Sequence, residues 1–312
     1  MKTLYIHPRK GLYQLTKCQK CGHTWGCQNC DAKLTTYRQS GGLLELLCHQ
    51  CQSYYQYPSK CPECNSTEIS SKYGGIDELV EELEKNLETI VIRLDKSIKI
   101  QEIENQNNTT FVTTRVFDPA IPYPKFERIV FYQSQNLLAS PDYLVQEETM
   151  KGIAEVLLKT GENTEVIFET NSKELDLFQE LMKLNSDHQE NEDIYNWFLK
   201  FLDKEKNIRQ KYKFPPFYNL LLITTQEKFR DRSLQSLVHV KDYLNKISSE
   251  LPGVSWSDPY PARFLKRKNL YSHHLLLKYP RQYENFRKLR SEIASLAELY
   301  NLQVRLNPRH LF

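Results

Sequence analysis

The sequence predicts an α/β protein with a metal-binding insertion near its N-terminus, and three observations support this prediction. Strand-like and helix-like patterns alternate over the first half of the chain, which favours a parallel sheet covered by helices. All eight cysteines lie between positions 18 and 64, as four Cys-x-x-Cys pairs, a spacing typical of zinc knuckles. The last hundred residues read strand-helix-strand-strand-helix-strand, the order of a ferredoxin-like domain.

Length and composition exclude disordered and membrane-spanning classes. The chain has 312 residues, of which 40% are hydrophobic and 12% aromatic, so a packed core is expected. No apolar run approaches the roughly 20 residues that cross a bilayer, and the first ten residues read as a short strand without the apolar region of a signal peptide. We therefore expect a cytoplasmic protein without a membrane partner, in which paired cysteines bind metal rather than form disulfides.

The cysteine pairs are predicted to hold two zinc ions. Each Cys-x-x-Cys turn directs two thiolates at one ion, and two turns complete a tetrahedral shell. Four pairs can combine in three ways, but 17 residues separate Cys30 from Cys48, within the range of a zinc ribbon. This spacing predicts nested pairing, in which the two inner cysteine pairs bind one ion and the two outer pairs bind the other. The expected ligands are Cys18, Cys21, Cys61 and Cys64 for zinc 1, and Cys27, Cys30, Cys48 and Cys51 for zinc 2.

Both ions are expected to be structural, because four thiolates leave no open coordination position for catalysis. Iron, in a rubredoxin-like site or an iron–sulfur cluster, is the main alternative metal. Gly22 and Asn65 each follow a cysteine pair and tolerate the tight or left-handed backbone that a knuckle requires. His23 and His49 flank the pairs and are not needed as ligands.

The remaining first half is expected to alternate strands and helices, with the cysteines inserted after the first strand. A helix is predicted over 76–87, where apolar residues recur at helical spacing and Asp77 and Glu78 occupy the first turn. A second helix is predicted over 141–158. Short β-branched and apolar runs predict strands at 4–6, 90–94, 110–114, 129–132 and 166–168.

A charged helical linker is predicted over 171–212, and a separate C-terminal domain over 213–312. The linker must end at Pro215 and Pro216, because proline cannot continue a helix. The domain's expected strands are 218–225, 254–257, 271–278 and 303–306, and its expected helices are 230–249 and 281–300. His273 and His274 adjoin the third of these strands, so their side chains point to opposite faces and cannot share a metal ion.

The charge distribution indicates a nucleic-acid surface at the C-terminal end. Residues 129–208 contain seven lysines, no arginine and sixteen carboxylates, whereas residues 259–312 contain eleven lysines and arginines against three glutamates. A basic end on a chain with an acidic middle is expected to meet phosphate, although an ordinary solvated surface is the alternative. A loop between the two middle strands carries the predicted DNA-binding residues, Arg263, Lys266, Arg267, Lys268 and Tyr271.

The chain resembles the C-terminal half of the PriA family of primosomal replication-restart DNA helicases. The residues that carry the resemblance are the cysteine array and shorter motifs in the same order: Cys18-Gln-Lys-Cys-Gly22, Cys48-His-Gln-Cys51, Tyr57-Pro58-Ser-Lys-Cys61-Pro62-Glu-Cys64, Gly74-Gly75, Ser140-Pro141-Asp142-Tyr143, Phe214-Pro215-Pro216-Phe217, Pro259-Tyr-Pro261-Ala262 and Asn307-Pro308. The resemblance implies a RecA-like second helicase lobe over 1–17 and 70–170, a double four-cysteine insertion over 18–66, and a DNA-binding C-terminal domain. It also implies forked or single-stranded DNA, primosome proteins and single-stranded-DNA-binding protein as partners.

Two departures from the family pattern bear on activity. The family's nucleotide-binding Gly-x-x-x-x-Gly-Lys-Ser/Thr loop has no counterpart, because no glycine precedes a lysine in the chain. The family's second lobe supplies an arginine finger, whereas no arginine lies between Arg128 and Arg209. We therefore expect a degenerate or truncated member that binds DNA without its own ATPase and helicase motor, and we predict no catalytic residue. The alternatives are one half of a split ATP-dependent 3′–5′ helicase and a zinc-ribbon scaffold for protein interactions.

Overall fold

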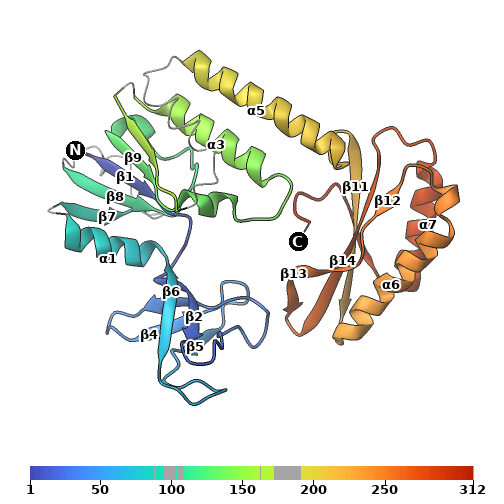
Figure 1. Cartoon of the computed structure of the whole chain (residues 1–312), viewed down its shortest axis with the longest axis horizontal. Coiled ribbons are helices and arrows are strands. Elements are labelled where there is room, and N and C mark those ends of the chain that lie inside the picture. The colour runs from blue at the N-terminus through green and yellow to red at the C-terminus, as the bar shows by residue number, and fades with distance from the viewer. Residues whose placement is uncertain (88, 95–102, 104–107, 162, 172–190, 312) are drawn as a thin grey trace. The chain divides into compact units, whose positions relative to one another are not determined.

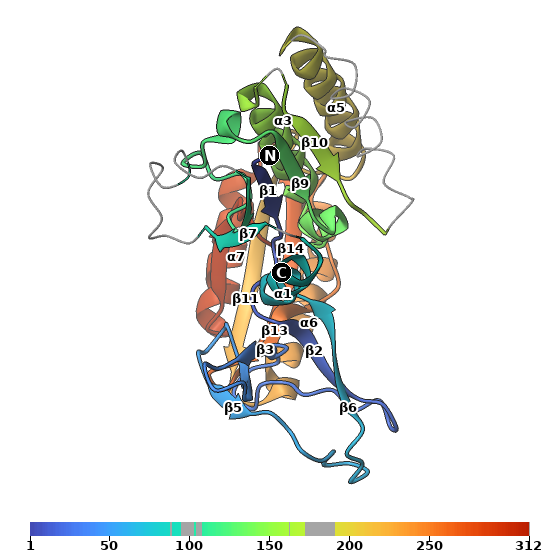
Figure 2. The same ribbon diagram turned by 90° about the vertical axis from the view of Figure 1, so that its left-hand side faces the viewer.

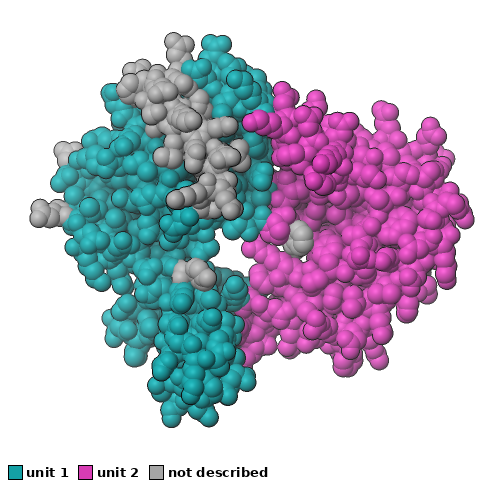
Figure 3. Space-filling view, viewed as in Figure 1, with its two compact units in different colours: residues 1–25, 33–140, 145–201 teal, residues 26–32, 141–144, 202–312 magenta. Residues whose placement is uncertain are grey.

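A computed structural model describes residues 1–87, 89–94, 103, 108–161, 163–171 and 191–311. The predicted linker over 171–212 therefore lies partly outside the described residues. The chain divides into two compact units (Figure 3): residues 1–25, 33–140 and 145–201 form the first, and residues 26–32, 141–144 and 202–312 form the second. Among the described residues, no helix combines the length and the apolar character that a membrane crossing requires.

The first unit contains a five-stranded parallel sheet in the order β10-β9-β1-β8-β7. Its strands are β1 (Thr3–Ile6), β7 (Ile90–Arg93), β8 (Thr109–Thr113), β9 (Arg128–Phe131) and β10 (Glu165–Phe168). The central strand β1 buries Leu4 and Ile6, as expected for a strand with neighbours on both sides. The predicted parallel sheet is confirmed, and each strand lies within one residue of its predicted position at either end.

Helices α1 (Ile76–Asn86) and α3 (Val145–Lys159) lie on opposite sides of this sheet (Figure 1). The apolar face of α1 packs Ile76, Leu79 and Leu83 against Val112 of β8, which is the stripe that the sequence spacing predicts. Helix α3 begins four residues later than predicted from the sequence. The described residues of this unit also contain two short 3-10 helices, Tyr123–Lys125 and Ser134–Leu138. The long helix α5 (Asn191–Lys211) begins in this unit and ends in the second.

The cysteine-rich segment lies between β1 and α1 and forms its own antiparallel sheet in the order β5-β4-β3-β2-β6. The strands are β2 (Tyr13–Cys18), β3 (Thr35–Arg38), β4 (Leu44–Leu47), β5 (Tyr54–Gln56) and β6 (Ile69–Gly74). Strand β6 leads directly into α1 (Figure 2). The insertion after the first strand is as predicted, whereas its five strands were not predicted.

The two ends of the insertion meet where the chain enters β2 and leaves β6. The backbone N–H of Gly75 donates to the carbonyl of Leu12 (2.8 Å), and the N–H of Ile76 donates to the carbonyl of Arg9 (2.9 Å). A Cβ atom on Gly75 would lie 2.1 Å from the carbonyl oxygen of Gly11. This crossing therefore has room for backbone only, and glycine is the residue that permits it.

The second unit contains an antiparallel sheet in the order β12-β14-β11-β15, with β13 also paired to β14. Its strands are β11 (Tyr218–Glu227), β12 (Ser255–Trp256), β13 (Tyr260–Arg267), β14 (Leu270–Pro280) and β15 (Gln303–Leu306). Helices α6 (Arg230–Lys246) and α7 (Phe286–Leu299) cover one side of it (Figure 1), and a 3-10 turn, Ser248–Glu250, follows α6. Leu237, Val240, Leu289 and Ile293 of the helices pack with the strands in the core.

Two predictions for this unit are wrong in detail. The segment expected to be a basic loop is strand β13, joined to β14 by Lys268 and Asn269, whose φ angles of 49° and 64° form a two-residue turn. Left-handed backbone at both turn positions is the geometry that closes a hairpin tightly. Helix α7 begins at Phe286 rather than at residue 281 because the strand continues to Pro280, and the N–H of Arg281 still donates to the carbonyl of Phe217 (3.0 Å).

The two adjacent histidines of β14 are both buried, with 3% and 4% of their surface exposed. His273 Nδ1 lies 2.8 Å from the Ser233 hydroxyl, and His274 Nδ1 lies 2.9 Å from the Thr224 hydroxyl. Their separate partners agree with the prediction that they cannot share a metal. Burial, with smaller contributions from Arg305 and His273, lowers the pKa of His274 to about 4.

This low pKa predicts that acid destabilises the second unit. The unfolded chain takes up the His274 proton near the ordinary histidine pKa of 6.5, whereas the folded chain does so only near 4. The stabilisation present at neutral pH is therefore lost progressively as the pH falls between these two values. This difference in the pKa of His274 corresponds to about 3 kcal/mol in the free energy of unfolding. Denaturant unfolding at pH 7.5 and pH 4.5 is expected to show a smaller pH effect for His274→Gln than for the native chain. Since both proteins share the same cysteines, acid release of metal cancels in the comparison, and equal pH effects would contradict the prediction.

Candidate metal centres

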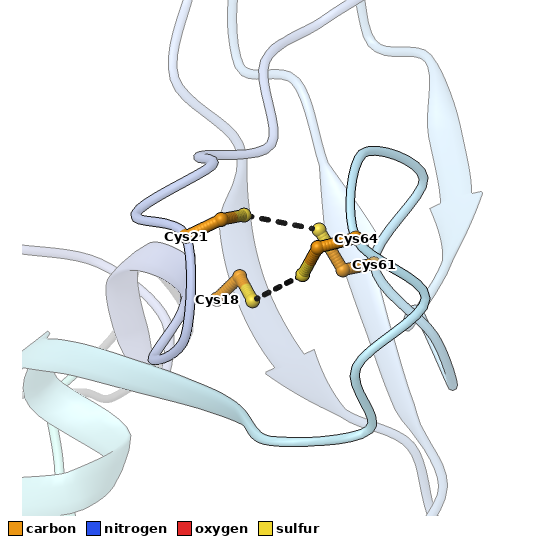
Figure 4. Close-up of side chains that lie close together, drawn as sticks. All are labelled: Cys18, Cys21, Cys61 and Cys64. Atoms are coloured by element: carbon orange, nitrogen blue, oxygen red, sulfur yellow. Dashed lines mark hydrogen bonds between the residues drawn. The ribbon is translucent and has the colours of Figure 1, made fainter.

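Four sulfur atoms converge at the outer cysteine pairs. Cys18 Sγ lies 3.6 Å from Cys64 Sγ, and Cys21 Sγ lies 3.5 Å from Cys61 Sγ (Figure 4). All four sulfurs lie within 4.8 Å of one another. Zn–S bonds of about 2.3 Å in a tetrahedron place sulfurs roughly 3.8 Å apart, and a disulfide needs about 2.05 Å. The arrangement therefore fits a tetrahedral metal ion and excludes disulfides.

Three of the four knuckles share one backbone turn. In each of these three, the carbonyl of the first cysteine accepts a hydrogen bond from the N–H four residues later, and the N–H of the same cysteine donates to the carbonyl five residues later. In the first knuckle, the Gly22 N–H donates to the Cys18 carbonyl (3.0 Å) and the Cys18 N–H donates to the His23 carbonyl (2.8 Å). The residue after the second cysteine has positive φ in each case: 81° at Gly22, 62° at Gln52 and 56° at Asn65. Gly22 and Asn65 were expected from their residue types. Gln52 was missed, although its position directly after a pair was the available signal.

The electrostatics of the outer site favour a cation. The backbone N–H of Cys21, then that of Lys20, lowers the pKa of the Cys18 thiol to about 6. The backbone N–H of His23 also favours a Cys21 thiolate, but desolvation and hydrogen bonds to the other three thiols outweigh it and raise the pKa of Cys21 to about 12. Four crowded thiols cannot all ionise unaided, and a divalent ion supplies the charge that allows it.

The inner cysteine pairs form the second group. Cys27, Cys30, Cys48 and Cys51 offer sulfur atoms that all lie within 4.8 Å of one another, with 3.9 Å between Cys27 and Cys30. The first three are buried and Cys51 is partly exposed. These two groups have the membership that nested pairing predicts, and each is complete without a histidine. His49 lies instead against Tyr37, whose hydroxyl is 3.1 Å from its Nε2.

The predicted DNA-binding residues all lie on the β13–β14 hairpin. Arg263, Arg267 and Lys268 are exposed, whereas Lys266 and Tyr271 are half-buried and face each other across the strand pair. Lys266 has partners within the second unit: its backbone N–H donates to the Asp31 carboxylate (2.8 Å), and its Nζ lies 3.4 Å from the Gln28 carbonyl oxygen.

The described residues thus offer two four-cysteine metal sites and a basic surface on the β13–β14 hairpin.

No protein-family model matches the chain. The chain is similar to replication restart protein PriA of Thermotoga maritima, with 23% identity over 88% of this chain and 36% of that protein. It is also similar to replication restart protein PriA of Haemophilus influenzae, with 24% identity over 96% of this chain and 40% of that protein. A shorter match, 34% identical, covers 29% of this chain and 10% of the probable replication restart protein PriA of Deinococcus radiodurans.

The chain spans two fifths or less of the length of these relatives. The two long matches cover 88% and 96% of this chain. The cysteine array and the ordered motifs predict the same relationship. The chain is therefore related to the PriA replication restart proteins and corresponds to a part of them.

Proposed function

We propose that this chain is a zinc-containing, DNA-binding part of a replication restart protein, acting in the cytoplasm on forked or single-stranded DNA. The observation that carries the proposal is the β13–β14 hairpin, which projects Arg263, Arg267 and Lys268 to the solvent. Cations on an exposed hairpin suit the phosphate backbone and need no particular base sequence. Primosome proteins and single-stranded-DNA-binding protein are the proposed protein partners, as the resemblance to the PriA family implies.

Both metal centres are proposed to hold Zn²⁺ in a structural role. Tetrahedral four-sulfur sites select zinc or iron, and a four-thiolate zinc site has no open position for water or substrate. The ions would hold the short strands β2 to β6 together, because a segment of this size has too small a core to fold unaided.

The remaining parts are proposed to follow the family's architecture. The parallel order β10-β9-β1-β8-β7 supports a degenerate RecA-like second helicase lobe over 1–17 and 70–170, interrupted by the metal-binding insertion over 18–66. The order β12-β14-β11-β15, with α6 and α7 on one side, supports a ferredoxin-like C-terminal domain over 213–312.

This part of the protein is proposed to lack a motor of its own. No arginine lies between Arg128 and Arg209, and an arginine finger contributes about 10³ to 10⁵ in rate where one is used. The parallel sheet favours one alternative, in which the chain pairs with a separate nucleotide-binding lobe as half of a split 3′–5′ helicase. DNA-stimulated ATP hydrolysis that appears only when such a lobe is added would support that alternative.

The DNA proposal is tested by replacing Arg263, Lys266, Arg267 and Lys268 with alanine together. Losing up to four phosphate contacts is expected to lower the affinity for single-stranded DNA by about 10²- to 10³-fold at 0.1 M salt. It should also reduce the magnitude of the slope of log affinity against log salt concentration by about 3. Fluorescence anisotropy over a salt series measures both quantities. The matched control removes four exposed cations of the same unit: Lys246, Arg281, Arg287 and Arg290.

Equal losses in the two quadruple variants would show that the hairpin has no special role. If the native chain with its metal bound fails to bind forked or single-stranded DNA even at low salt, the zinc-ribbon scaffold for protein partners becomes the better account.

A further inference from the structure

An apolar pocket of about 420 Å³ lies within the second unit. Aromatic rings and prolines form most of its walls; the lining residues are Pro141, Tyr143, Phe214, Tyr260, Pro261, Leu276 and Leu311. Tyr143 and Phe214 stack with ring centroids 4.9 Å apart and an interplanar angle of 12°. The volume falls within the roughly 300–1,000 Å³ of small-ligand sites, and flat rings favour a flat aromatic ligand.

The charges beside this pocket are predominantly positive. Lys278 Nζ lies 3.6 Å above the ring of Phe214, and Lys213 is near enough to lower the pKa of Lys278, although burial contributes more. Burial first, then the Asp142 carboxylate, raises the pKa of Tyr260 to about 12, while Arg305 acts in the opposite direction.

The one carboxylate among these described neighbours is already engaged. Asp142 accepts hydrogen bonds from the Leu311 N–H (2.8 Å) and is 3.0 Å from His310 Nδ1. A flat aromatic ligand therefore complements the walls of the pocket, and negative charge along the same ligand complements the cations beside it.

The pocket and the basic hairpin share a strand. Tyr260 and Pro261 begin β13, which then carries Arg263, Lys266 and Arg267 toward the turn. At about 3.3 Å per residue, seven steps span roughly 23 Å, enough for several nucleotides of an extended strand. One polymer can thus lie along the cations of β13 and reach the pocket with a terminal or unstacked base.

We propose that this pocket binds a nucleobase of single-stranded nucleic acid whose phosphates follow β13. The inference rests on the proposed DNA-binding function and adds base stacking to its phosphate contacts. Stacking on aromatic side chains tolerates every base, because each has a π face, and contributes about 1–3 kcal/mol per base. An apolar peptide side chain is less favoured, because it leaves the cations beside the pocket without a partner.

The test compares two fluorescein-labelled 12-mers, dT12 and an oligomer with tetrahydrofuran in place of every base, which retains the phosphates alone. For the native 312-residue chain, the base-free oligomer is expected to bind roughly 5- to 150-fold more weakly. Tyr143→Leu removes a ring, and Pro261→Glu places a carboxylate at an exposed lining position; both are expected to bring this ratio close to 1. Pro252→Glu, at an exposed proline outside the lining, is the matched control and should keep the native ratio.

The hairpin variant separates the pocket from the phosphate-binding surface. The quadruple alanine change should weaken both oligomers and leave their ratio unchanged. The pocket proposal would be wrong if the native chain bound both oligomers with equal affinity. It would also be wrong if the affinity ratio of dT12 to the base-free oligomer stayed high in Tyr143→Leu and Pro261→Glu. Either result would leave the proposed DNA-binding function unaffected. Absence of binding to either oligomer removes the proposed function, and the pocket with it.

Discussion

Replacing Cys61 with serine is expected to remove one metal ion per chain and to unfold the sheet β5-β4-β3-β2-β6. Cys61 is buried, and its sulfur lies 3.5 Å from that of Cys21, so its loss leaves three thiolates and an incomplete shell. Structural zinc sites contribute on the order of 10 kcal/mol, far more than a sheet of three- to six-residue strands gains from its own core. Mass spectrometry should find one zinc per chain instead of two, and limited proteolysis should cut within residues 12–75.

The matched control is Ser59→Ala, which changes an exposed residue two positions earlier and should retain both ions and full protease resistance. A Cys61→Ser protein that keeps two ions would show that the outer cysteines do not form one centre. Iron rather than zinc in the native protein would correct the identity of the metal while leaving the grouping of ligands intact.

Replacing Gly75 with alanine is expected to destabilise the first unit by about 3 kcal/mol or more. The added Cβ would lie 2.1 Å from the Gly11 carbonyl oxygen and 2.7 Å from that of Lys10, and both obstacles are backbone atoms that cannot rotate away. Relief requires a shift of the chain crossing, at the cost typical of severe overpacking. Denaturant unfolding measures the loss.

Gly41→Ala is the matched control for this change. A Cβ on Gly41 would meet nothing within 4 Å, and Gly41 is not among the residues with positive φ. Its unfolding free energy should stay within about 0.5 kcal/mol of the native value. Equal stability of Gly75→Ala and Gly41→Ala would mean that the crossing adjusts without cost.

The sequence did not reveal the strands of the insertion or strand β13. Strands β2 to β6 are short and mix tyrosine, threonine, glutamine and charged residues without a clean alternation, so their periodicity carries little signal. Strand β13 contains Pro261 and three cations in eight residues, a composition that reads as a loop. Its pairing with β14 and the turn at Lys268 and Asn269 make it a strand, as edge positions permit.

What the sequence determined by itself is local or strongly patterned. Four Cys-x-x-Cys pairs limit the metal groupings to three, and one spacing selects the grouping that the structure contains. Buried parallel strands read as apolar runs, because both of their faces are covered. What only the tertiary structure decided depends on residues far apart in the chain. The backbone crossing of Gly75 over Gly11 and the pocket that joins Tyr143 to Phe214 and Tyr260 leave no periodic trace, because each arises from packing between segments that the sequence does not place together.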